Sequence, residues 1–212
     1  LVFTLVAIRL IDKLGRKPLL IIGTTAMTIA LTMATLAFNN ATYEVNEDTL
    51  SKIENEEMRT ALGSLSGNTY YSQEETFTAA SGVLDEDQLF SFKRNEIKNF
   101  ISINATLVLV AILLYVAAFA ISLGPVMWTL LSEIFPGNIK GIAISVVGFF
   151  NSLVSYTVTQ FFPWELTNLG PTWTFAIYAI LAGLSLLFVL KFVIETKGKS
   201  LEEVEELLVN SN

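Results

Sequence analysis

The stretch that decides the fold is Gly124-Pro125-Val126-Met127-Trp128-Thr129-Leu130-Leu131-Ser132-Glu133-Ile134-Phe135-Pro136. It ends a long apolar run. Pro125 interrupts that run because proline has no backbone N–H and its ring crowds the preceding turn, and Gly124 adds backbone freedom at the same point. In lipid, the backbone groups freed by a break are tolerated only where they are buried in protein or line a cavity. The stretch therefore predicts a broken transmembrane helix. Either it is a hinge beside a binding site that Trp128 contacts, or it is a kink that only shapes packing.

The composition around this stretch is that of a membrane protein. Of the 212 residues, 52% are hydrophobic and 16% are charged, whereas soluble domains have about 25% charged residues. Apolar runs of about 20 residues recur, which predicts an all-α, multi-pass membrane protein. Residues 1–8 make only half of a span and no methionine precedes them. We therefore expect the chain to be the C-terminal piece of a longer protein.

Four divisions follow from the alternation of apolar and polar segments. Residues 1–38 hold the half-span, a basic loop at 9–17 and a full span that Pro18 opens. Residues 39–99 are polar, and residues 100–193 hold three spans, at 100–131, 142–162 and 171–193, with a connection at 163–170. Residues 194–212 form a tail, in which Ser200 and Glu203 make a capping box that opens an amphipathic helix.

The polar segment at 39–99 carries twelve acidic and five basic residues, which accounts for the whole net charge of -7. Its periodicity predicts one short surface helix at 49–62. Residues 63–82 are rich in Ser, Thr and Gly and predict a loop. The pattern does not predict a separate domain, and it indicates no function for the segment.

The basic residues predict the topology. Four lie in the loop at 9–17 and three in 191–199, whereas the loop at 163–170 has none. The positive-inside rule then places 9–17, 132–141 and the tail in the cytoplasm, and 39–99 and 163–170 outside.

A charge cluster is expected at the cytoplasmic end. Asp12, Gly15 and Arg16 stand in a tight loop, and Glu133 and Lys140 stand in the neighbouring loop. We expect Arg16 to pair with Glu133. A charge cluster that opens and closes with conformation would suit a two-state transporter; the alternative is that these charges only set the topology.

The predicted spans contain no carboxylate, and the chain has no His and no Cys. The sequence therefore predicts no enzyme site, no metal site and no cofactor. Nothing in it points to binding of a nucleic acid. Neutral polar side chains with aromatics suit an uncharged, hydroxyl-rich solute; the alternative is that they join helices. These side chains are Asn104, Thr106, Ser122, Thr129, Asn151, Ser152, Ser155, Tyr156, Gln160 and Tyr178.

Four ordered motifs resemble the sugar porters of the major facilitator superfamily. Residues 12–17 are similar to the Asp-x-x-Gly-Arg-Arg/Lys loop, and residues 124–128 resemble the Gly-Pro-x-x-Trp break in the tenth helix. Residues 132–136 look like the loop that follows. Residues 194–198 resemble the Pro-Glu-Thr-Lys-Gly signature after the twelfth helix, with Ile194 in place of proline. The sequence looks most like the bacterial xylose–proton symporters and the glucose facilitators.

The resemblance implies a twelve-helix fold with alternating access, of which this chain is the part from the end of helix 8 to helix 12. Residues 148–151 are similar to the glucose-facilitator pattern of helix eleven, although Ser152 stands where that family often has Trp. The implied sugar contacts are Gly124, Trp128 and Asn151. The implied hinge is Gly124 with Pro125, and the implied charge lock is Asp12, Arg16, Glu133, Lys140 and Glu195.

The resemblance also implies a function: transport of a hexose or pentose across the plasma or inner membrane, with proton symport expected. The implied partners are the sugar, protons, the lipid bilayer and the N-terminal half of the transporter. Facilitated diffusion without coupling and a transporter-like sugar sensor are the alternatives. A membrane enzyme is disfavoured by the absence of His, Cys and intramembrane acids.

Overall fold

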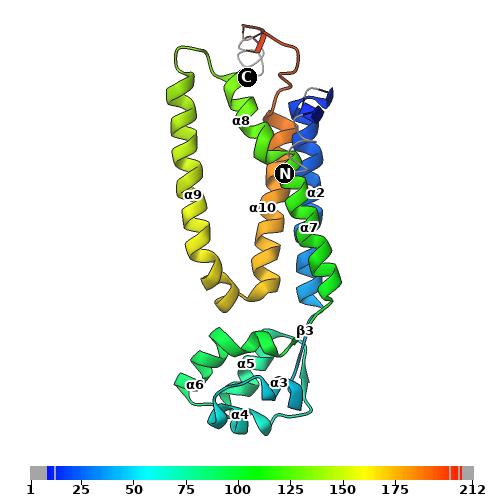
Figure 1. The fold of residues 1–212 in the computed structure, drawn as a ribbon, viewed down its shortest axis with the longest axis vertical. Coiled ribbons are helices and arrows are strands. Elements are labelled where there is room, and N and C mark those ends of the chain that lie inside the picture. Colours follow the sequence, from blue (N-terminus) through cyan, green and yellow to red (C-terminus); the bar gives the residue numbers. More distant parts are fainter. Residues whose placement is uncertain (1–8, 12, 201, 205, 207–212) are drawn as a thin grey trace.

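The structure is a computed structural model that describes residues 9–11, 13–200, 202–204 and 206 (Figure 1). The predicted half-span at 1–8 and residues 201, 205, 207 and 208 of the predicted tail helix lie outside the described residues. Four segments of the described part are long and apolar enough to cross a membrane: Arg16–Asn39, Ala105–Ile134, Lys140–Asn168 and Gly170–Phe192. The four predicted full spans of an all-α membrane fold are therefore confirmed.

The centre of the bundle is helix α2 (Arg16–Asn39), which packs against α10 (Gly170–Phe192) and α7 (Ala105–Ile121). The buried stripe of α2 is made mostly of small residues spaced three and four apart, among them Gly23, Ala30, Ala34 and Ala37. Small residues let helix backbones approach closely in a membrane. The Thr24 hydroxyl donates to the Leu20 carbonyl at 2.7 Å, so this buried polar group is satisfied within its own helix.

The predicted helix break is present, and it falls at Ser122, between α7 and α8 (Leu123–Ile134). Ser122 leaves the helical conformation at φ -116° and ψ -94°. Proline deprives the turn before it of a hydrogen bond and crowds the carbonyl four residues back, so the break precedes Pro125. The buried Ser122 hydroxyl donates to the Ala118 carbonyl at 2.7 Å, so this buried side chain is itself satisfied at the break.

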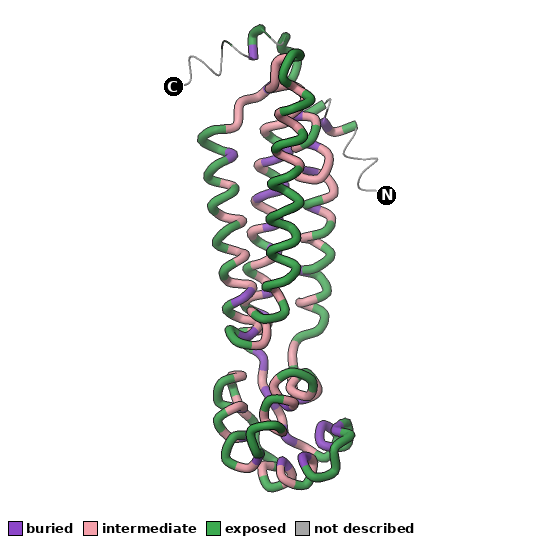
Figure 2. The backbone as a smooth tube through the Cα atoms, turned by 90° about the vertical axis from the view of Figure 1, so that its left-hand side faces the viewer, coloured by how far each residue is buried: buried purple, intermediate pink, exposed green. Residues whose placement is uncertain are grey.

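Helix α9 (Lys140–Asn168) stands apart from the other spans over most of its length (Figure 1). It contacts α8 near its start and α10 near its end, and none of its residues is buried (Figure 2). The predicted connection at 163–170 was wrong, because α9 continues through Pro163 to Asn168 and α10 begins at Gly170. Proline removes one hydrogen bond from the exposed end of a long helix, and the helix tolerates that loss.

The chain between α2 and α7 forms a compact structure, which we call the 40–104 unit. It contains the three strands β1 (Thr42–Glu44), β2 (Thr69–Tyr70) and β3 (Ile101–Ser102) in the antiparallel order β2-β1-β3. Its helical elements are α3 (Glu47–Ser51), α4 (Glu56–Gly63), α5 (Gln73–Ser81), α6 (Glu86–Ser91), a π-helical turn η1 (Phe92–Glu96) and a 3₁₀ turn η2 (Ile97–Asn99).

The 40–104 unit has its own hydrophobic core, which corrects the prediction of a surface helix and a loop. Phe92 and Phe100 are almost completely buried and pack edge to face, with ring centroids 5.4 Å apart. The predicted helix at 49–62 is two helices separated at residues 52–55, and the predicted loop at 63–82 contains β2 and α5. Side chains of Asn46, Asn55, Ser72 and Asp85 cap α3, α4, α5 and α6 in turn.

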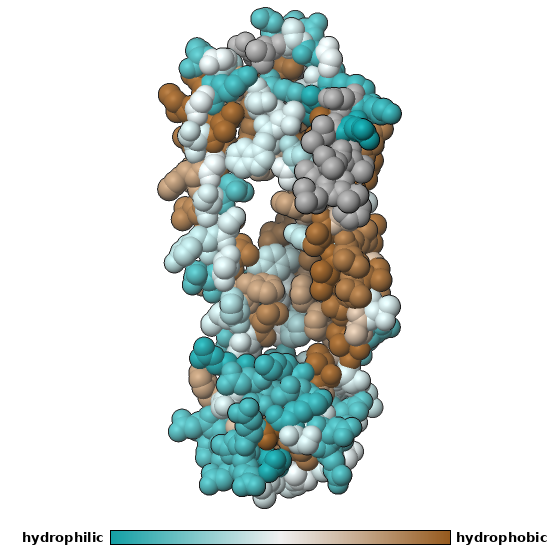
Figure 3. All heavy atoms as spheres, viewed as in Figure 1, coloured by the Kyte–Doolittle hydropathy of each residue, from teal (hydrophilic) through white to brown (hydrophobic). Residues whose placement is uncertain are grey.

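The 40–104 unit lies at one end of the spans, beside the turn between α9 and α10 (Figure 1). The opposite end, which we call the basic end, gathers residues 9–11, 13–17, 135–139 and 193–199. Polar surface covers the 40–104 unit and the basic end, and apolar surface covers much of the spans between them (Figure 3). The two groups of loops that the charge pattern assigns to opposite sides therefore lie at opposite ends.

Candidate functional site

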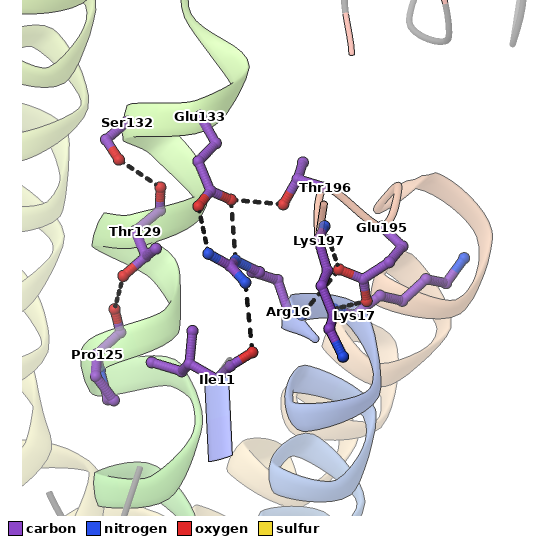
Figure 4. A network of polar contacts seen from close by, with 10 residues as sticks. All are labelled: Ile11, Arg16, Lys17, Pro125, Thr129, Ser132, Glu133, Glu195, Thr196 and Lys197. Carbon is purple, nitrogen blue, oxygen red and sulfur yellow. Dashed lines mark hydrogen bonds and ion pairs between the residues drawn. The ribbon is translucent and has the colours of Figure 1, made fainter. Parts of the chain in front are cut away.

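A network of polar side chains joins three segments at the basic end (Figure 4). Arg16 begins α2, and its Nη2 and Nε atoms lie 2.6 and 3.0 Å from the two carboxylate oxygens of Glu133 at the end of α8. The Thr196 hydroxyl donates to the same carboxylate at 2.6 Å. The two charged side chains are 13% and 27% exposed. The structure thus brings together the predicted pair, as a forked and largely shielded contact of the strong type.

Glu195 plays a part that the sequence did not specify. Its carboxylate accepts hydrogen bonds from the backbone N–H groups of Arg16 at 3.0 Å and Lys17 at 3.1 Å, the first two residues of α2. The cap residue of α2, Gly15, has no side chain that could accept them. A carboxylate at a helix N-terminus satisfies unpaired donors and interacts favourably with the helix dipole. Glu195 therefore fastens the segment after α10 to the start of α2.

The environment of Glu195 changes its acidity. Burial raises the pKa of the Glu195 carboxyl, but hydrogen bonds from backbone groups of Lys197, Arg16, Lys17 and Thr196 outweigh that effect and hold the pKa below its ordinary value. The carboxyl is therefore held in its charged, accepting form.

Gly15 is required by this contact. Its φ of 94° is in the left-handed region, and a Cβ atom there would lie 2.5 Å from Glu195 Oε2. Only glycine adopts this conformation freely and leaves room for the carboxylate. The tight glycine of the predicted charge loop is thus explained by the cap that covers it.

The other two predicted members of the charge lock, Asp12 and Lys140, are not part of the network that the described residues form. Asp12 lies outside the described residues. Lys140 lines a cavity of about 360 Å³ together with Arg16, Glu133 and Thr196, but it takes part in none of the ion pairs of the described residues. The structure therefore places Lys140 beside the network and not in it.

The predicted sugar contacts lie on α8 and α9. The Trp128 side chain is 44% exposed and its ring approaches α9, because a Cβ atom on Gly148 would lie 3.9 Å from Trp128 Cη2. Asn151, one turn farther along α9, is exposed, and its amide makes no hydrogen bond to any described residue. In contrast, the Ser152 hydroxyl donates to the Gly148 carbonyl at 2.9 Å. An indole and an unoccupied amide on facing helices are groups that can hold a hydroxylated solute.

The predicted hinge residues have different surroundings. A Cβ atom on Gly124 would lie 3.2 Å from the Phe119 carbonyl oxygen, so this glycine allows close contact across the break. The Pro125 carbonyl accepts a hydrogen bond from the Thr129 hydroxyl at 3.1 Å. Both residues lie just after the break at Ser122, where a hinge would bend.

A cavity of about 410 Å³ lies between α2, α7, α9 and α10, and none of the predicted sugar contacts lines it. Its walls are mostly apolar, with the hydroxyl groups of Tyr115, Tyr178 and Ser185. Figure 3 shows the molecule hollowed between α9 and the other spans. The largely apolar walls offer few partners for a sugar, so this cavity does not replace the face formed by Trp128 and Asn151.

Two further contacts were not predicted from the sequence. Glu165 was expected in a loop, but it lies on α9, and its carboxylate accepts a hydrogen bond from the Tyr178 hydroxyl of α10 at 3.0 Å. The predicted spans contain no carboxylate, but the structure extends two of them, to Ile134 and to Asn168, so that they include Glu133 and Glu165. In addition, a Cβ atom on Gly23 would lie 1.7 Å from Ser122 Oγ, so α2 touches the helix break directly. A glycine in the middle of a predicted span was the available signal for that contact.

Comparison with known proteins shows which family has these features. The profile of the family described as "Sugar (and other) transporter" matches residues 1–52 and 88–208. The chain is 32% identical over 213 residues to the D-xylose-proton symporter of Escherichia coli (strain K12), covering 98% of this chain and 31% of that protein. It is 29% identical over 208 residues to the arabinose-proton symporter of Bacillus subtilis (strain 168), covering 98% and 32%.

Solved structures of similar proteins agree with the family match. The inward open conformation of the xylose transporter XylE from E. coli matches with a TM-score of 0.62 and 32% identity, over 97% of this chain and 33% of that one. The major facilitator superfamily proton:xylose symporter XylE bound to 6-bromo-6-deoxy-D-glucose matches with a TM-score of 0.61 and 32% identity, over 98% and 32%. The chain spans about a third of the length of these relatives.

The family match includes every span and the network at the basic end, and it omits residues 53–87, in the middle of the 40–104 unit. The chain is thus a multi-pass protein of the plasma or inner membrane, and it belongs to the sugar porters of the major facilitator superfamily.

Proposed function

We propose that the protein to which this chain belongs transports a monosaccharide, a pentose or a hexose, by alternating access and in symport with protons. Relatives that resemble nearly the whole chain are named as symporters of D-xylose and arabinose with protons. The observation that carries the proposal within the structure is the exposed pair of Trp128 and Asn151 on facing helices, next to a broken helix. Charged solutes are not favoured there, because neither side chain carries a charge.

The network at the basic end supplies the two-state element of the proposal. Alternating access requires contacts that exist in one state and are lost in the other. Arg16, Glu133 and Glu195 join the starts and ends of different spans, so separating these spans must break several charged hydrogen bonds together. In this proposal the basic end faces the cytoplasm, the 40–104 unit faces outside, and the network closes the cytoplasmic side.

Uncoupled transport is the second candidate, because another relative of this chain is a facilitated glucose transporter of Xenopus tropicalis, 28% identical over 241 residues. A signalling or catalytic role has weaker support, since the family consists of transporters and the described residues contain no group of acids that could hold a metal ion.

Flux in liposomes separates these functions. The full-length protein is reconstituted, and uptake of radiolabelled D-xylose, L-arabinose and D-glucose is followed with and without an imposed proton gradient. Symport predicts accumulation above the outside concentration with the gradient, and loss of that accumulation with a proton ionophore. Equilibration that ignores the gradient would instead establish facilitated diffusion. The absence of any sugar flux, in protein shown to be folded, would overturn the proposal of transport.

A further inference from the structure

The basic residues of the 40–104 unit are distributed unevenly. The unit contains twelve acidic and five basic residues, and three of the five bases, Lys93, Arg94 and Lys98, occur within η1 and η2. None of these three takes part in an ion pair of the described residues, whereas Arg59 pairs with Glu56 at 3.2 Å. A strongly acidic unit thus carries, in one short segment, three cations that have no ion-pair partner among the described residues.

These cations face the membrane-spanning helices. Lys93, Arg94 and Lys98 line a cavity of about 580 Å³ whose other walls include Phe162 and Phe175 of α9 and α10. Lys93 and Arg94 also line a second cavity, of about 680 Å³, with Trp164. Among the described residues, no acidic side chain lines either cavity. The Lys93 ammonium is held 5.0 Å from the centre of the Phe77 ring, which directs it without neutralising it.

The cluster adjoins a turn that carries two exposed tryptophans. Trp164 and Trp173 flank the turn between α9 and α10 and are both largely exposed, as is typical of side chains at the membrane–water interface. The cavities join the basic segment to this turn, so the cations lie beside the tryptophan pair that is typical of the interface where phospholipid headgroups lie.

An apolar path leads from the cluster toward the membrane core. Phe162 and Phe175 line the 580 Å³ cavity and also the 410 Å³ cavity between α2, α7, α9 and α10. The two cavities therefore share a wall. The first offers positive charge and the second offers almost only apolar surface, which is the polarity of a phospholipid from its headgroup to its acyl chains.

We propose that Lys93, Arg94 and Lys98, with the groove between α9 and α10, form a binding site for an anionic phospholipid, the phosphate bound by the three cations and an acyl chain lying along Phe162 and Phe175. Bound lipid would hold the 40–104 unit against the ends of the spans. A free phosphate would satisfy the cations but would leave the apolar part of the groove unoccupied.

The test measures binding of phosphatidylglycerol to the full-length protein in detergent by native mass spectrometry. Lys93→Gln/Arg94→Gln is compared with Lys52→Gln/Arg59→Gln, which removes the same two charge types from elsewhere in the unit. Each basic residue near an anionic lipid surface contributes about fivefold in binding, so the first variant is expected to bind about 30-fold more weakly. The control variant and the charge-preserving variant Lys93→Arg/Arg94→Lys are expected to bind within about twofold of the original protein.

Two probes identify the source of the phosphate. Glycerol 3-phosphate carries the charge without the chains, and diacylglycerol carries the chains without the charge; both are expected to bind at least about 30-fold more weakly than phosphatidylglycerol. Equal binding of glycerol 3-phosphate would establish a site for a soluble anion and overturn the proposal. Equal losses in the two charge-removing variants, or no loss in either, would also overturn it.

Discussion

Removing the charge from Arg16 or Glu133 tests the proposed lock most sharply. The substitutions are Arg16→Gln and Glu133→Gln, singly and together. Glu133→Gln is nearly isosteric and Arg16→Gln shortens the side chain, and neither residue belongs to the small apolar core of the basic end around Leu19, Val126 and Leu130.

The structure sets the expected magnitude. The two side chains meet through two contacts of 2.6 and 3.0 Å and are 13% and 27% exposed. Hydrogen bonds to charged groups contribute about 1.5–3 kcal/mol each when partly shielded. Since Thr196 remains to donate to Glu133, we expect a coupling energy of about 2 kcal/mol between Arg16 and Glu133. If the pair exists only when this end is closed, its loss increases the open population about 30-fold.

Labelling of an introduced cysteine measures that population. Ser132 lines the cavity beside Glu133 and is half-buried, and this chain has no cysteine of its own. In a full-length protein that carries Ser132→Cys as its one cysteine, the rate of reaction with a membrane-impermeant maleimide follows the open population. Each single substitution is expected to raise the rate about 30-fold, and the double substitution little further, because both remove one interaction.

An exposed pair in the same chain provides the control. Arg59 and Glu56 lie 3.2 Å apart with side chains 40% and 85% exposed, and such pairs contribute at most about 1 kcal/mol. Glu56→Gln is expected to leave the labelling rate unchanged. A labelling rate that stays constant in both single variants would refute the lock, as would effects of Arg16→Gln and Glu133→Gln that simply add.

Three further predictions concern glycine packing, pH and the 40–104 unit. Gly23→Ala places a methyl group 1.7 Å from a buried hydroxyl at the helix break and should destabilise the protein in detergent by about 1–3 kcal/mol. The control Gly183→Ala, whose Cβ would lie 3.9 Å from its nearest neighbour, should leave the unfolding temperature unchanged. Equal effects of the two substitutions would contradict the packing of α2 against the break. The pKa of Glu195 is lowered from 4.5, so its charge stabilises the folded state above pH 4.5, and that contribution is lost as the pH falls through the lowered pKa. The difference in unfolding temperature between the original protein and Glu195→Gln should therefore shrink in acid. A difference that grows in acid would contradict the role of Glu195 as a cap of α2. Phe92→Ala empties a buried core position and should destabilise the 40–104 unit by about 3–5 kcal/mol, so that a protease cuts the unit at least ~100-fold faster. Phe90→Ala, at a side chain that is 64% exposed, should leave the cleavage rate unchanged. Equal cleavage of the two variants would argue against the hydrophobic core of the unit.

The spans and the helix break could be predicted from the sequence because their signals are local, and the Arg16–Glu133 pair could be predicted because the topology brings two loops to the same end. An apolar run of sufficient length crosses a membrane whatever lies beside it. Pro125 breaks a helix for steric reasons that do not depend on the rest of the fold. Few charges border the spans, so Arg16 and Glu133 were easily recognised as partners.

The fold of the 40–104 unit could not be predicted in this way. Its strands have two or three residues, and its core joins Tyr43, Phe92 and Phe100, which are distant in the sequence. No periodic pattern extends over enough residues to indicate these contacts. The contact of Gly23 with Ser122 was missed for a related reason, since the register between two helices is not contained in either helix alone.

The role of Glu195 was only partly predictable. A motif placed it near the other charges, but its bonds go to the backbone of α2 and not to a basic side chain. The sequence placed the start of this helix at Pro18, whereas α2 begins at Arg16, directly after Gly15. Because Gly15 has no side chain to cap the helix, the acceptor comes from elsewhere, and the predicted start at Pro18 hid that need.

The most direct test of the account is uptake of radiolabelled sugar by the full-length protein with substitutions at the face between α8 and α9. Trp128→Ala and Asn151→Ala each remove a group proposed to contact the sugar, and a lost buried contact of this kind lowers affinity by about 1–3 kcal/mol. Uptake at low sugar concentration is expected to fall about 10-fold or more in each variant. Trp173→Ala and Asn168→Ala, at exposed positions near the turn between α9 and α10, should retain uptake within about twofold. Undiminished uptake after Trp128→Ala and Asn151→Ala would contradict the account.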